Sequence, residues 1–156
     1  KMSLSCAECL YAGMMTDTGA FTFNSNNPEI YYIISELLKK GVDKDAIYSK
    51  VYNTYSVDRL RLMGYMLSQK MEILPEYHTA IITLTKAELD EFNYKEGDTE
   101  GFVNIPLSIK GIVFSVLVKE GKEMVKLSLR SRGTFPVNKV AAALFNVGAH
   151  INASGG

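Results

Sequence analysis

The spacing of apolar residues changes partway along this 156-residue chain, and that change most restricts how it can fold. The first half places apolar residues at helical intervals, whereas the second half contains β-branched runs such as Thr79–Thr85. Pro75 closes the helical half. Helices followed by strands and short helices predict an α/β chain, of the α+β kind, with a mixed or antiparallel sheet. We expect a boundary near residues 72–78, dividing the chain into parts 1–75 and 76–156.

Helix-start signals divide the first half. After a helical pattern that begins near Leu4, Asn27-Pro28 supplies an N-cap and a proline at the first helical position. Asp43 is expected to cap a short helix to about Tyr52, and Ser56 another. The apolar stripe expected to face inward on this last helix comprises Leu60, Met63, Leu67 and Met71.

Strands and helices are both expected in the second half. The expected strands are Thr79–Thr85, Phe102–Ile105, Ile112–Val118 and Met124–Leu129, the last two joined by a hairpin turn. The expected helices are Lys86–Tyr94 and Asn138–Phe145. Pro106 cannot donate to a central ladder, so its stretch is expected at a sheet edge or bulge.

Charge is balanced overall but unevenly distributed. Lys plus Arg and Asp plus Glu each number 17, which argues against a general polyanion binder. Residues 86–100 contain two Lys and six acidic residues, whereas residues 121–156 contain five basic residues and Glu123. The second segment could attract an anionic ligand locally, or it could be a solvated face of the sheet.

The two cysteines cannot form a disulfide framework, so a cytoplasmic location is expected. Cys6 and Cys9 lie in a helical pattern with no second cysteine pair, and we interpret them as buried core residues rather than zinc ligands. Apolar runs are only a few residues long, so no membrane span is expected. The first residue, Lys1, and the glycine-rich end indicate a fragment of a longer chain.

Three short segments could carry chemistry. Asp17, in the polar run Thr16–Gly19, could bind a hard metal ion or cap a turn. Arg130-Ser131 offers a guanidinium fork and a hydroxyl to phosphate, or forms a charged turn. The small residues of 148–156 could bring backbone N–H groups to an anion, with His150 as a further donor.

Taken together, these segments resemble the DHH phosphoesterase family. The resemblance rests on the runs YAGMMTDTGAF (11–21), VKLSLRS (125–131) and FNVGAHINASGG (145–156). It is nearest to the oligoribonuclease and phosphoadenosine-phosphate phosphatase branch, often labelled exopolyphosphatase-related. It implies that residues 1–75 are the helical end of a DHH catalytic domain and linker. Residues 76–156 would then be the associated substrate-binding domain, truncated, with the active site between the two.

The resemblance also implies roles for individual residues. Asp17 would bind one or both of two Mn²⁺ ions, and His150 would be catalytic. The residues implied to hold the substrate are Arg130, Ser131, Gly148, His150, Asn152 and Ser154. Asp17 and His150 are expected to face each other across a gap between two lobes. The family's usual Gly-Gly-Gly-His is Val147-Gly148-Ala149-His150 here, and side chains at 147 and 149 could narrow the phosphate loop.

The activity expected from the resemblance is hydrolysis of short oligonucleotides or a nucleoside 3′,5′-bisphosphate by metal-activated water. Cyclic-dinucleotide phosphodiesterase and exopolyphosphatase activities remain open. The upstream metal motifs are absent, so this segment alone is expected to be inactive, and a nucleotide- or phosphate-binding module is the non-enzymatic alternative. An interaction domain that pairs through the sheet edge near Pro106 is a third. Short RNA or a nucleotide phosphate is the expected partner, and a homodimer remains open.

Overall fold

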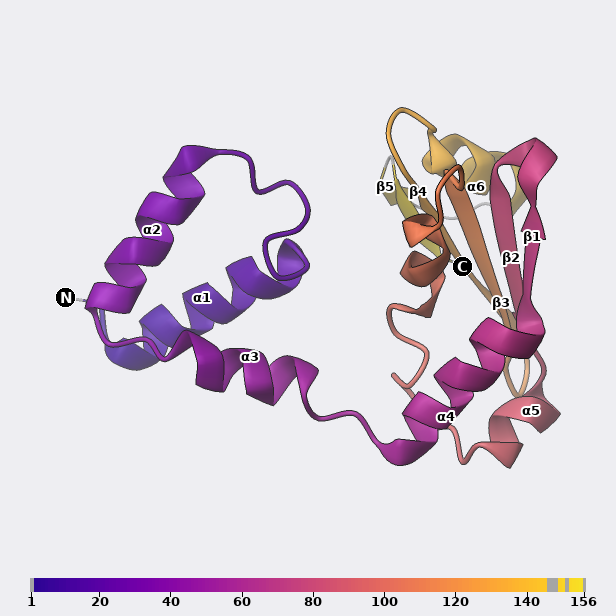
Figure 1. Ribbon diagram of the computed structural model, residues 1–156, viewed down its shortest axis with the longest axis horizontal. Coiled ribbons are helices and arrows are strands. Elements are labelled where there is room, and N and C mark those ends of the chain that lie inside the picture. The colour runs from indigo at the N-terminus through magenta and orange to yellow at the C-terminus, as the bar shows by residue number, and fades with distance from the viewer. Residues whose placement is uncertain (1, 146–148, 151, 156) are drawn as a thin grey trace. The chain divides into compact units, whose positions relative to one another are not determined.

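The computed structural model describes residues 2–145, 149–150 and 152–155. Its contacts divide the chain into two compact units, Lys1–Tyr55 and Ser56–Gly156 (Figure 1). The division lies upstream of the boundary expected near residues 72–78. The reason is that the helix following Ser56 packs into the core of the second unit. The assignment of parts 1–75 and 76–156 to two domains of a DHH enzyme stays a prediction.

The first unit is helical, as predicted, with α1 (Leu4–Asp17), α2 (Pro28–Lys39) and α3 (Lys44–Tyr52). The predicted caps are confirmed, because the Asn27 side chain accepts from the Glu29 N–H and that of Asp43 from the N–H groups of Asp45 and Ala46. The buried core of this unit comprises Ala7, Tyr11, Met15, Leu37 and Val42.

The prediction that Cys6 and Cys9 are buried is wrong within this unit. Both are exposed free thiols. The buried side of α1 follows Ala7, Tyr11 and Met15, which are four residues apart, and the cysteines lie off that line.

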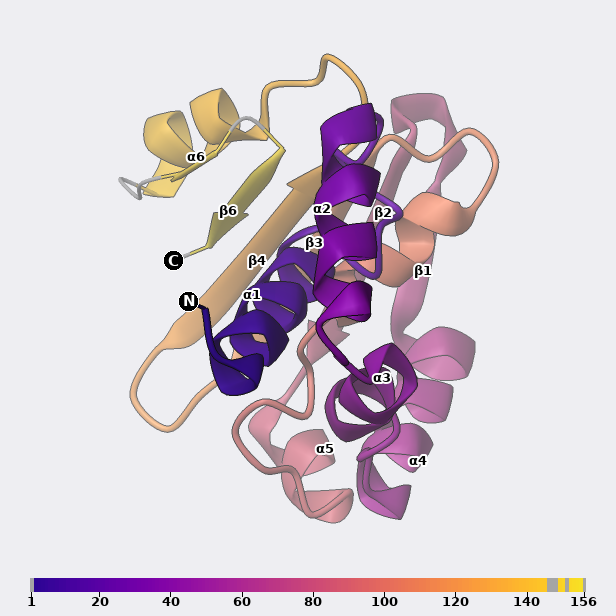
Figure 2. The same cartoon turned by 90° about the vertical axis from the view of Figure 1, so that its left-hand side faces the viewer.

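The second unit is built on a six-stranded mixed sheet in the order β1-β2-β3-β4-β6-β5. Its strands are β1 (Met71–Leu74), β2 (Thr79–Leu84), β3 (Phe114–Glu120), β4 (Val125–Ser131), β5 (Ala149–His150) and β6 (Ala153–Gly155). Strands β2 and β3 are parallel and the other pairs are antiparallel. The α+β class and the mixed sheet are therefore as predicted. Figure 2 shows β4 and β6 side by side.

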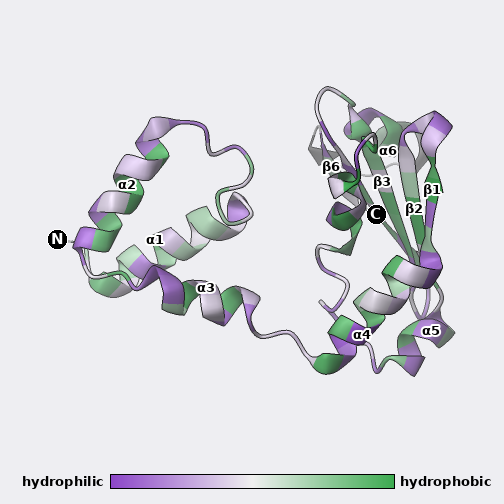
Figure 3. Ribbon diagram, in the orientation of Figure 1, coloured by the Kyte–Doolittle hydropathy of each residue, from purple (hydrophilic) through white to green (hydrophobic). Residues whose placement is uncertain are grey.

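Helical segments cover both faces of this sheet. One face is packed by α4 (Val57–Tyr65), a π-helical segment (Met66–Lys70), α5 (Lys86–Glu91) and a 3₁₀ helix (Phe102–Ser108). The other is packed by α6 (Val137–Phe145) against Leu129, Phe114 and Val116. A short 3₁₀ turn, Pro75–Tyr77, joins β1 to β2. Hydrophobic residues continue along β2 and β3 between the two layers (Figure 3).

The predicted strand at Phe102–Ile105 is wrong, because these residues form a 3₁₀ helix that contains Pro106. Gly101 begins it with a left-handed φ of 84°, and Phe102, Val103 and Leu107 are all buried. A strand would alternate these apolar side chains between two faces, whereas the tighter helix places them in one core. The interaction edge expected near Pro106 is therefore absent from this position.

None of the helices within the described residues is both long and apolar enough to cross a membrane.

Candidate functional site

Asp17 is the final residue of α1 rather than part of the loop beyond it, and its side chain is exposed. The next residue fixes the turn. The buried Thr18 hydroxyl donates to the Met14 carbonyl at 2.6 Å and accepts from the Phe21 N–H at 3.0 Å. Thr18 thus ends the helix and holds the backbone that follows Asp17 in one conformation.

Three consecutive residues after Thr18 have left-handed backbone conformations. Their φ values are 54° at Gly19, 56° at Ala20 and 63° at Phe21. A Cβ on Gly19 would lie 2.8 Å from Phe23 Cδ2, so that position favours glycine on two grounds. Left-handed non-glycine residues cost on the order of 1 kcal/mol each. The turn that follows Asp17 is therefore strained at Ala20 and Phe21.

The described residues do not form a metal centre by themselves. Among residues 2–145, 149–150 and 152–155 there is no group of three or more His, Cys, Asp and Glu side chains that could hold a metal ion. One carboxylate does not suffice for a two-metal site. The role of Asp17 as a Mn²⁺ ligand stays a prediction.

Arg130 is the second-to-last residue of β4, not the start of a turn. Its side chain is partly buried, and Nη1 donates to the Leu129 carbonyl at 2.9 Å and to the Ser154 carbonyl at 3.2 Å. Burial lowers the pKa of the guanidinium, and the carboxylate of Glu100 opposes that shift. Since an arginine remains charged even so, Arg130 is a partly desolvated cation, and within the described residues both of its hydrogen bonds are made through Nη1.

A pocket of about 210 Å³ opens beside Arg130. It lies on the sheet face formed by alternate residues of β3 and β4, where Lys119 is opposite Lys126 and Leu117 opposite Ser128. The loop 96–101 forms its other side. Three cations and two carboxylates, Glu96 and Glu100, surround it. A partly buried arginine with two lysines in a polar pocket is an arrangement that binds phosphate oxygens.

Ser131 lies on the opposite face from Arg130, because adjacent strand residues alternate. The buried Ser131 hydroxyl donates to the Phe135 carbonyl at 2.7 Å and is 3.2 Å from Oδ1 of Asn152. Ser154 is 4% exposed, and within the described residues its hydroxyl has no hydrogen-bond partner. The structure therefore places Arg130, Ser131 and Ser154 on the neighbouring strands β4 and β6, but Arg130 faces the opposite side from Ser131.

His150 lies in β5, where its backbone pairs with Ala153. Gly148 lies outside the described residues. The catalytic role of His150, the substrate-binding roles and the expected proximity of Asp17 to His150 all stay predictions.

Three further residues line the pocket: Lys119, which lies outside the motifs, and Lys126 and Ser128, which lie in the run 125–131 but were given no role. The uneven distribution of charge along the sequence was the one indication of these residues. The acidic segment 86–100 and the basic segment 121–156 meet at this pocket, where the loop 96–101 lies against β4. Sequence spacing alone could not show that the two segments are neighbours, because it is the path of the loop 96–101 that brings them together at the pocket.

The chain is similar to several known proteins, although no protein-family model matches it. NrnA of Thermus thermophilus, a bifunctional oligoribonuclease and PAP phosphatase, is 33% identical over 143 residues, which cover 92% of this chain and 42% of that protein. The probable NrnA of Streptococcus mutans is 30% identical over 142 residues, covering 90% and 44%. A crystal structure of an exopolyphosphatase-related protein from Bacteroides fragilis is 64% identical, with a TM-score of 0.96, covering 99% of this chain and 45% of that one.

These relatives are named as phosphoesterases, and the similarities confirm the resemblance to DHH phosphoesterases that the motifs indicated. Within that family, the relatives are of the oligoribonuclease and PAP phosphatase branch, so the chain is related to NrnA-type proteins over most of its length. The chain spans less than half the length of the relatives it matches.

Proposed function

We propose that this chain supplies the substrate-binding part of a manganese-dependent phosphoesterase that hydrolyses short oligonucleotides or a nucleoside 3′,5′-bisphosphate. The observation that carries the proposal is the partly buried Arg130 in a polar pocket with Lys119 and Lys126. The names of the NrnA relatives, which join oligoribonuclease and PAP phosphatase activities, supply the substrate class.

Arg130 would act by binding. With Nη1 held by two carbonyls, the remaining guanidinium N–H groups can donate to a phosphate in a fixed direction. Such positioning lowers the entropy cost of bringing the scissile phosphate to a reactive group. The manganese requirement rests on the family alone, and Asp17 would be the one ligand that this chain provides. Exposed free thiols at Cys6 and Cys9 support a reducing, cytoplasmic location.

A binding module without activity of its own is the second candidate. It is favoured by the lack of a metal-ligand cluster within the described part of the chain. Exopolyphosphatase or cyclic-dinucleotide phosphodiesterase activity would use the same phosphate pocket, so these remain alternatives within the first proposal.

Two measurements on the 156-residue chain test the proposal: binding of a nucleoside bisphosphate, and its hydrolysis in the presence of Mn²⁺. We expect adenosine 3′,5′-bisphosphate to bind in a calorimetric titration and to remain intact when Mn²⁺ is added. The substitution Arg130→Gln is expected to weaken binding at least tenfold, since it removes a charge-assisted phosphate contact. Arg132→Gln is the matched control, because Arg132 is exposed and lies outside the pocket. Equal loss in both variants would contradict a specific role for Arg130, and rapid hydrolysis would contradict the need for further metal ligands.

A further inference from the structure

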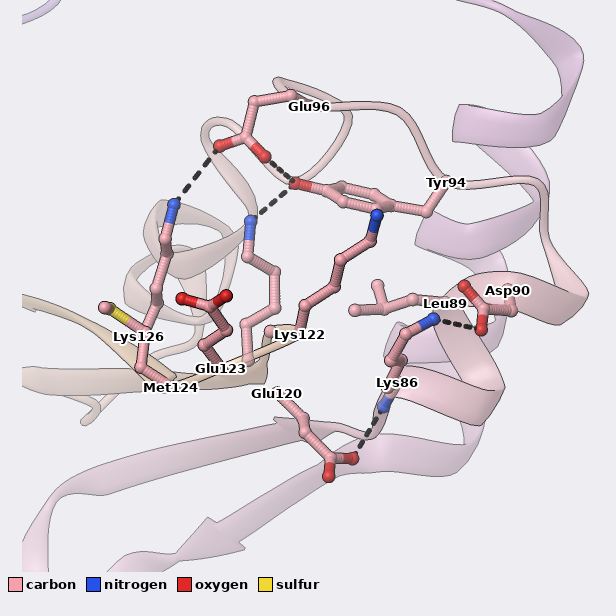
Figure 4. Close-up of a pocket in the computed structure, with 12 residues that line it drawn as sticks. Lys86, Leu89, Asp90, Tyr94, Glu96, Glu120, Lys122, Glu123, Met124 and Lys126 are labelled. Carbon is pink, nitrogen blue, oxygen red and sulfur yellow. Dashed lines mark hydrogen bonds and ion pairs between the residues drawn. The ribbon is translucent and has the colours of Figure 1, made fainter.

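A second pocket adjoins the one beside Arg130. It has a volume of about 450 Å³ and lies between α5 and the turn that joins β3 to β4 (Figure 4). Lys119, Lys126 and Glu96 line both pockets. The two pockets are therefore neighbours along the β3–β4 hairpin, with Arg130 lining the smaller one, and we refer to them together as the groove.

The two parts of this groove differ in charge. The smaller pocket has three cations and two carboxylates. The larger has four lysines and four carboxylates, so its charges balance. An anionic group is consequently favoured in the smaller pocket, near Lys126 and Arg130, and a neutral group in the larger one.

Lys126 is available to an incoming anion. Its side chain is 52% exposed, and its amine is 3.5 Å from Oε1 of Glu96, a distance at the limit of a hydrogen bond. Lys119 is held more firmly, because its amine donates to the Tyr94 hydroxyl at 2.6 Å and to the Thr99 hydroxyl at 3.3 Å. The positive charges of Lys119 and Lys126 lower the pKa of the Glu96 carboxyl.

Apolar surface lines the larger pocket. Tyr94, Leu89 and Met124 contribute to its wall, and Figure 4 shows Tyr94 and Leu89 facing the same space. The Tyr94 ring is held in place, since the Lys119 amine lies 4.7 Å from its centroid and Glu96 is 3.3 Å from its hydroxyl. A fixed aromatic ring next to cations is how proteins bind single-stranded nucleotides without reading their sequence. A volume of about 450 Å³ is in the range of small-ligand sites.

We propose that this groove is a nucleotide subsite, in which Lys126 and Lys119 hold a phosphate and the Tyr94 ring stacks on the adjoining base. The inference rests on the proposed function and extends it. A ligand anchored at Arg130 continues along the β3–β4 hairpin toward α5. The substrate class that fills the whole groove is an oligonucleotide of at least two nucleotides, rather than a single nucleotide.

Glu96 has a second role in this proposal. Its carboxylate interacts with Lys126 and Lys119, and a bound phosphate would compete with it for these two lysines. Glu96→Gln keeps the size of the side chain and removes the competing charge. We therefore expect it to tighten binding of a dinucleotide several-fold.

Calorimetric titration of the complete 156-residue chain tests the groove. The ligands are the 5′-phosphorylated dinucleotide of adenosine, adenosine 5′-monophosphate and inorganic phosphate. Lys126→Gln should weaken dinucleotide binding about tenfold, because a charge-assisted contact is lost. Tyr94→Leu should weaken the dinucleotide at least fivefold and leave inorganic phosphate unchanged, since only the base uses the ring. Lys110→Gln, at an exposed lysine outside both pockets, is the charge-matched control.

Tyr94→Phe is the control for a general loss of folding in Tyr94→Leu, because it keeps the ring and removes only the hydroxyl. It should bind the dinucleotide within threefold of the unsubstituted chain. If Arg130→Gln weakens the dinucleotide while Lys126→Gln and both Tyr94 variants bind normally, the groove proposal is overturned and the proposed function stands. If the unsubstituted chain binds none of the three ligands, the proposed function itself is overturned.

Discussion

Glu88 joins three parts of the second unit through one carboxylate. It accepts from the Lys70 amine at 2.8 Å, from the Tyr65 hydroxyl at 2.7 Å and from the Thr85 N–H at 2.8 Å. The Thr85 hydroxyl accepts in turn from the Glu88 N–H, which completes a capping box at the start of α5. Burial opposes the charged form of Glu88, but these donors outweigh it and lower its pKa to about 2.

The lowered pKa of Glu88 predicts a stability difference that depends on pH. A carboxyl with a folded-state pKa of about 2 and an ordinary value of 4.5 stabilises the fold fully above pH 4.5, and the contribution is lost as the pH falls toward 2. We expect Glu88→Gln to lower the free energy of unfolding by about 2 kcal/mol at pH 7. Urea titrations between pH 7 and pH 3 should show the two chains converging at acid pH. A difference that stays constant across this range would contradict the assignment.

Ser131 could stabilise the fold or contact the ligand, and one substitution distinguishes the two roles. Its hydroxyl donates to the Phe135 carbonyl, which also accepts from the Val137 N–H at 3.1 Å, and Ser131 is 7% exposed. We expect Ser131→Ala to cost about 1 kcal/mol of unfolding free energy, because the hydrogen bonds made by a buried hydroxyl are lost. Binding of adenosine 3′,5′-bisphosphate should weaken less than in Arg130→Gln. A loss of affinity as large as that of Arg130→Gln, in a chain of normal stability, would show that Ser131 contacts the ligand directly.

At the level of elements, segment 57–71 is a case in which the spacing of apolar residues does not identify which side chains are buried. Regular spacing predicted an inward stripe of Leu60, Met63, Leu67 and Met71, whereas the fully buried residues are Leu62 and Met66. The helix changes to π geometry at Met66, and Met71 already belongs to β1. Met63 and Met71 of the predicted stripe do pack against the core, so the pattern is wrong at Leu60 and Leu67, and the π geometry can shift only the side chains that follow its start at Met66.

Substitutions at the neighbouring residues Met66 and Leu67 test which of the two packs in the core. Met66 is 0% exposed and Leu67 is 37% exposed. Met66→Ala should reduce the free energy of unfolding by about 2–4 kcal/mol through the cavity it leaves, and Leu67→Ala by less than about 1 kcal/mol. Chemical denaturation of the two variants gives both values. The reverse order would support the regular stripe that the sequence indicated.

The elements that were predictable from sequence are those whose signals are local. Caps at Asn27, Asp43 and Ser56 and the β-branched run at Thr79 depend on neighbouring residues only, and the structure contains each of them. The sequence pattern missed strand β1 and the short strands β5 and β6, of which β6 also pairs with the more distant β4. The 3₁₀ helix at Phe102 was mistaken for a strand because its apolar residues are consecutive, a pattern that both structures share.

The candidate site was predictable to a similar extent. Arg130 was found through its guanidinium chemistry and its place in a family motif, and it does line a polar pocket. Lys119, Lys126 and Tyr94 were not found, because they belong to three segments that only the register of β3 with β4 and the path of the loop 96–101 bring together. The separation of Arg130 from Ser131 onto two faces follows from strand alternation, and it was missed because the end of β4 was placed too early.

At the scale of the whole molecule, the division between Tyr55 and Ser56 assigns the sheet, Arg130 and both pockets to one compact unit. Ser56 marks its start, because its hydroxyl accepts from the Arg59 N–H at 3.0 Å and begins α4. Within that unit, Arg59 donates to the carbonyls of Gly97 and Glu100, at 2.7 Å each, and so ties α4 to the loop that borders the groove. Helix α4 is therefore part of what shapes the ligand site.

A chain of residues 56–156 should accordingly fold alone and bind the phosphorylated dinucleotide within about twofold of the 156-residue chain. A chain of residues 76–156, cut at the boundary that the sequence suggested, is the matched comparison. It lacks Leu62, Met66 and β1, so Ile82 and Leu84 lose their covering layer and the sheet loses an edge strand. We expect it to lose cooperative unfolding and dinucleotide binding, as measured by circular dichroism and calorimetry. Equal stability of the two shorter chains would place the structural boundary at residue 75 and detach α4 from the site.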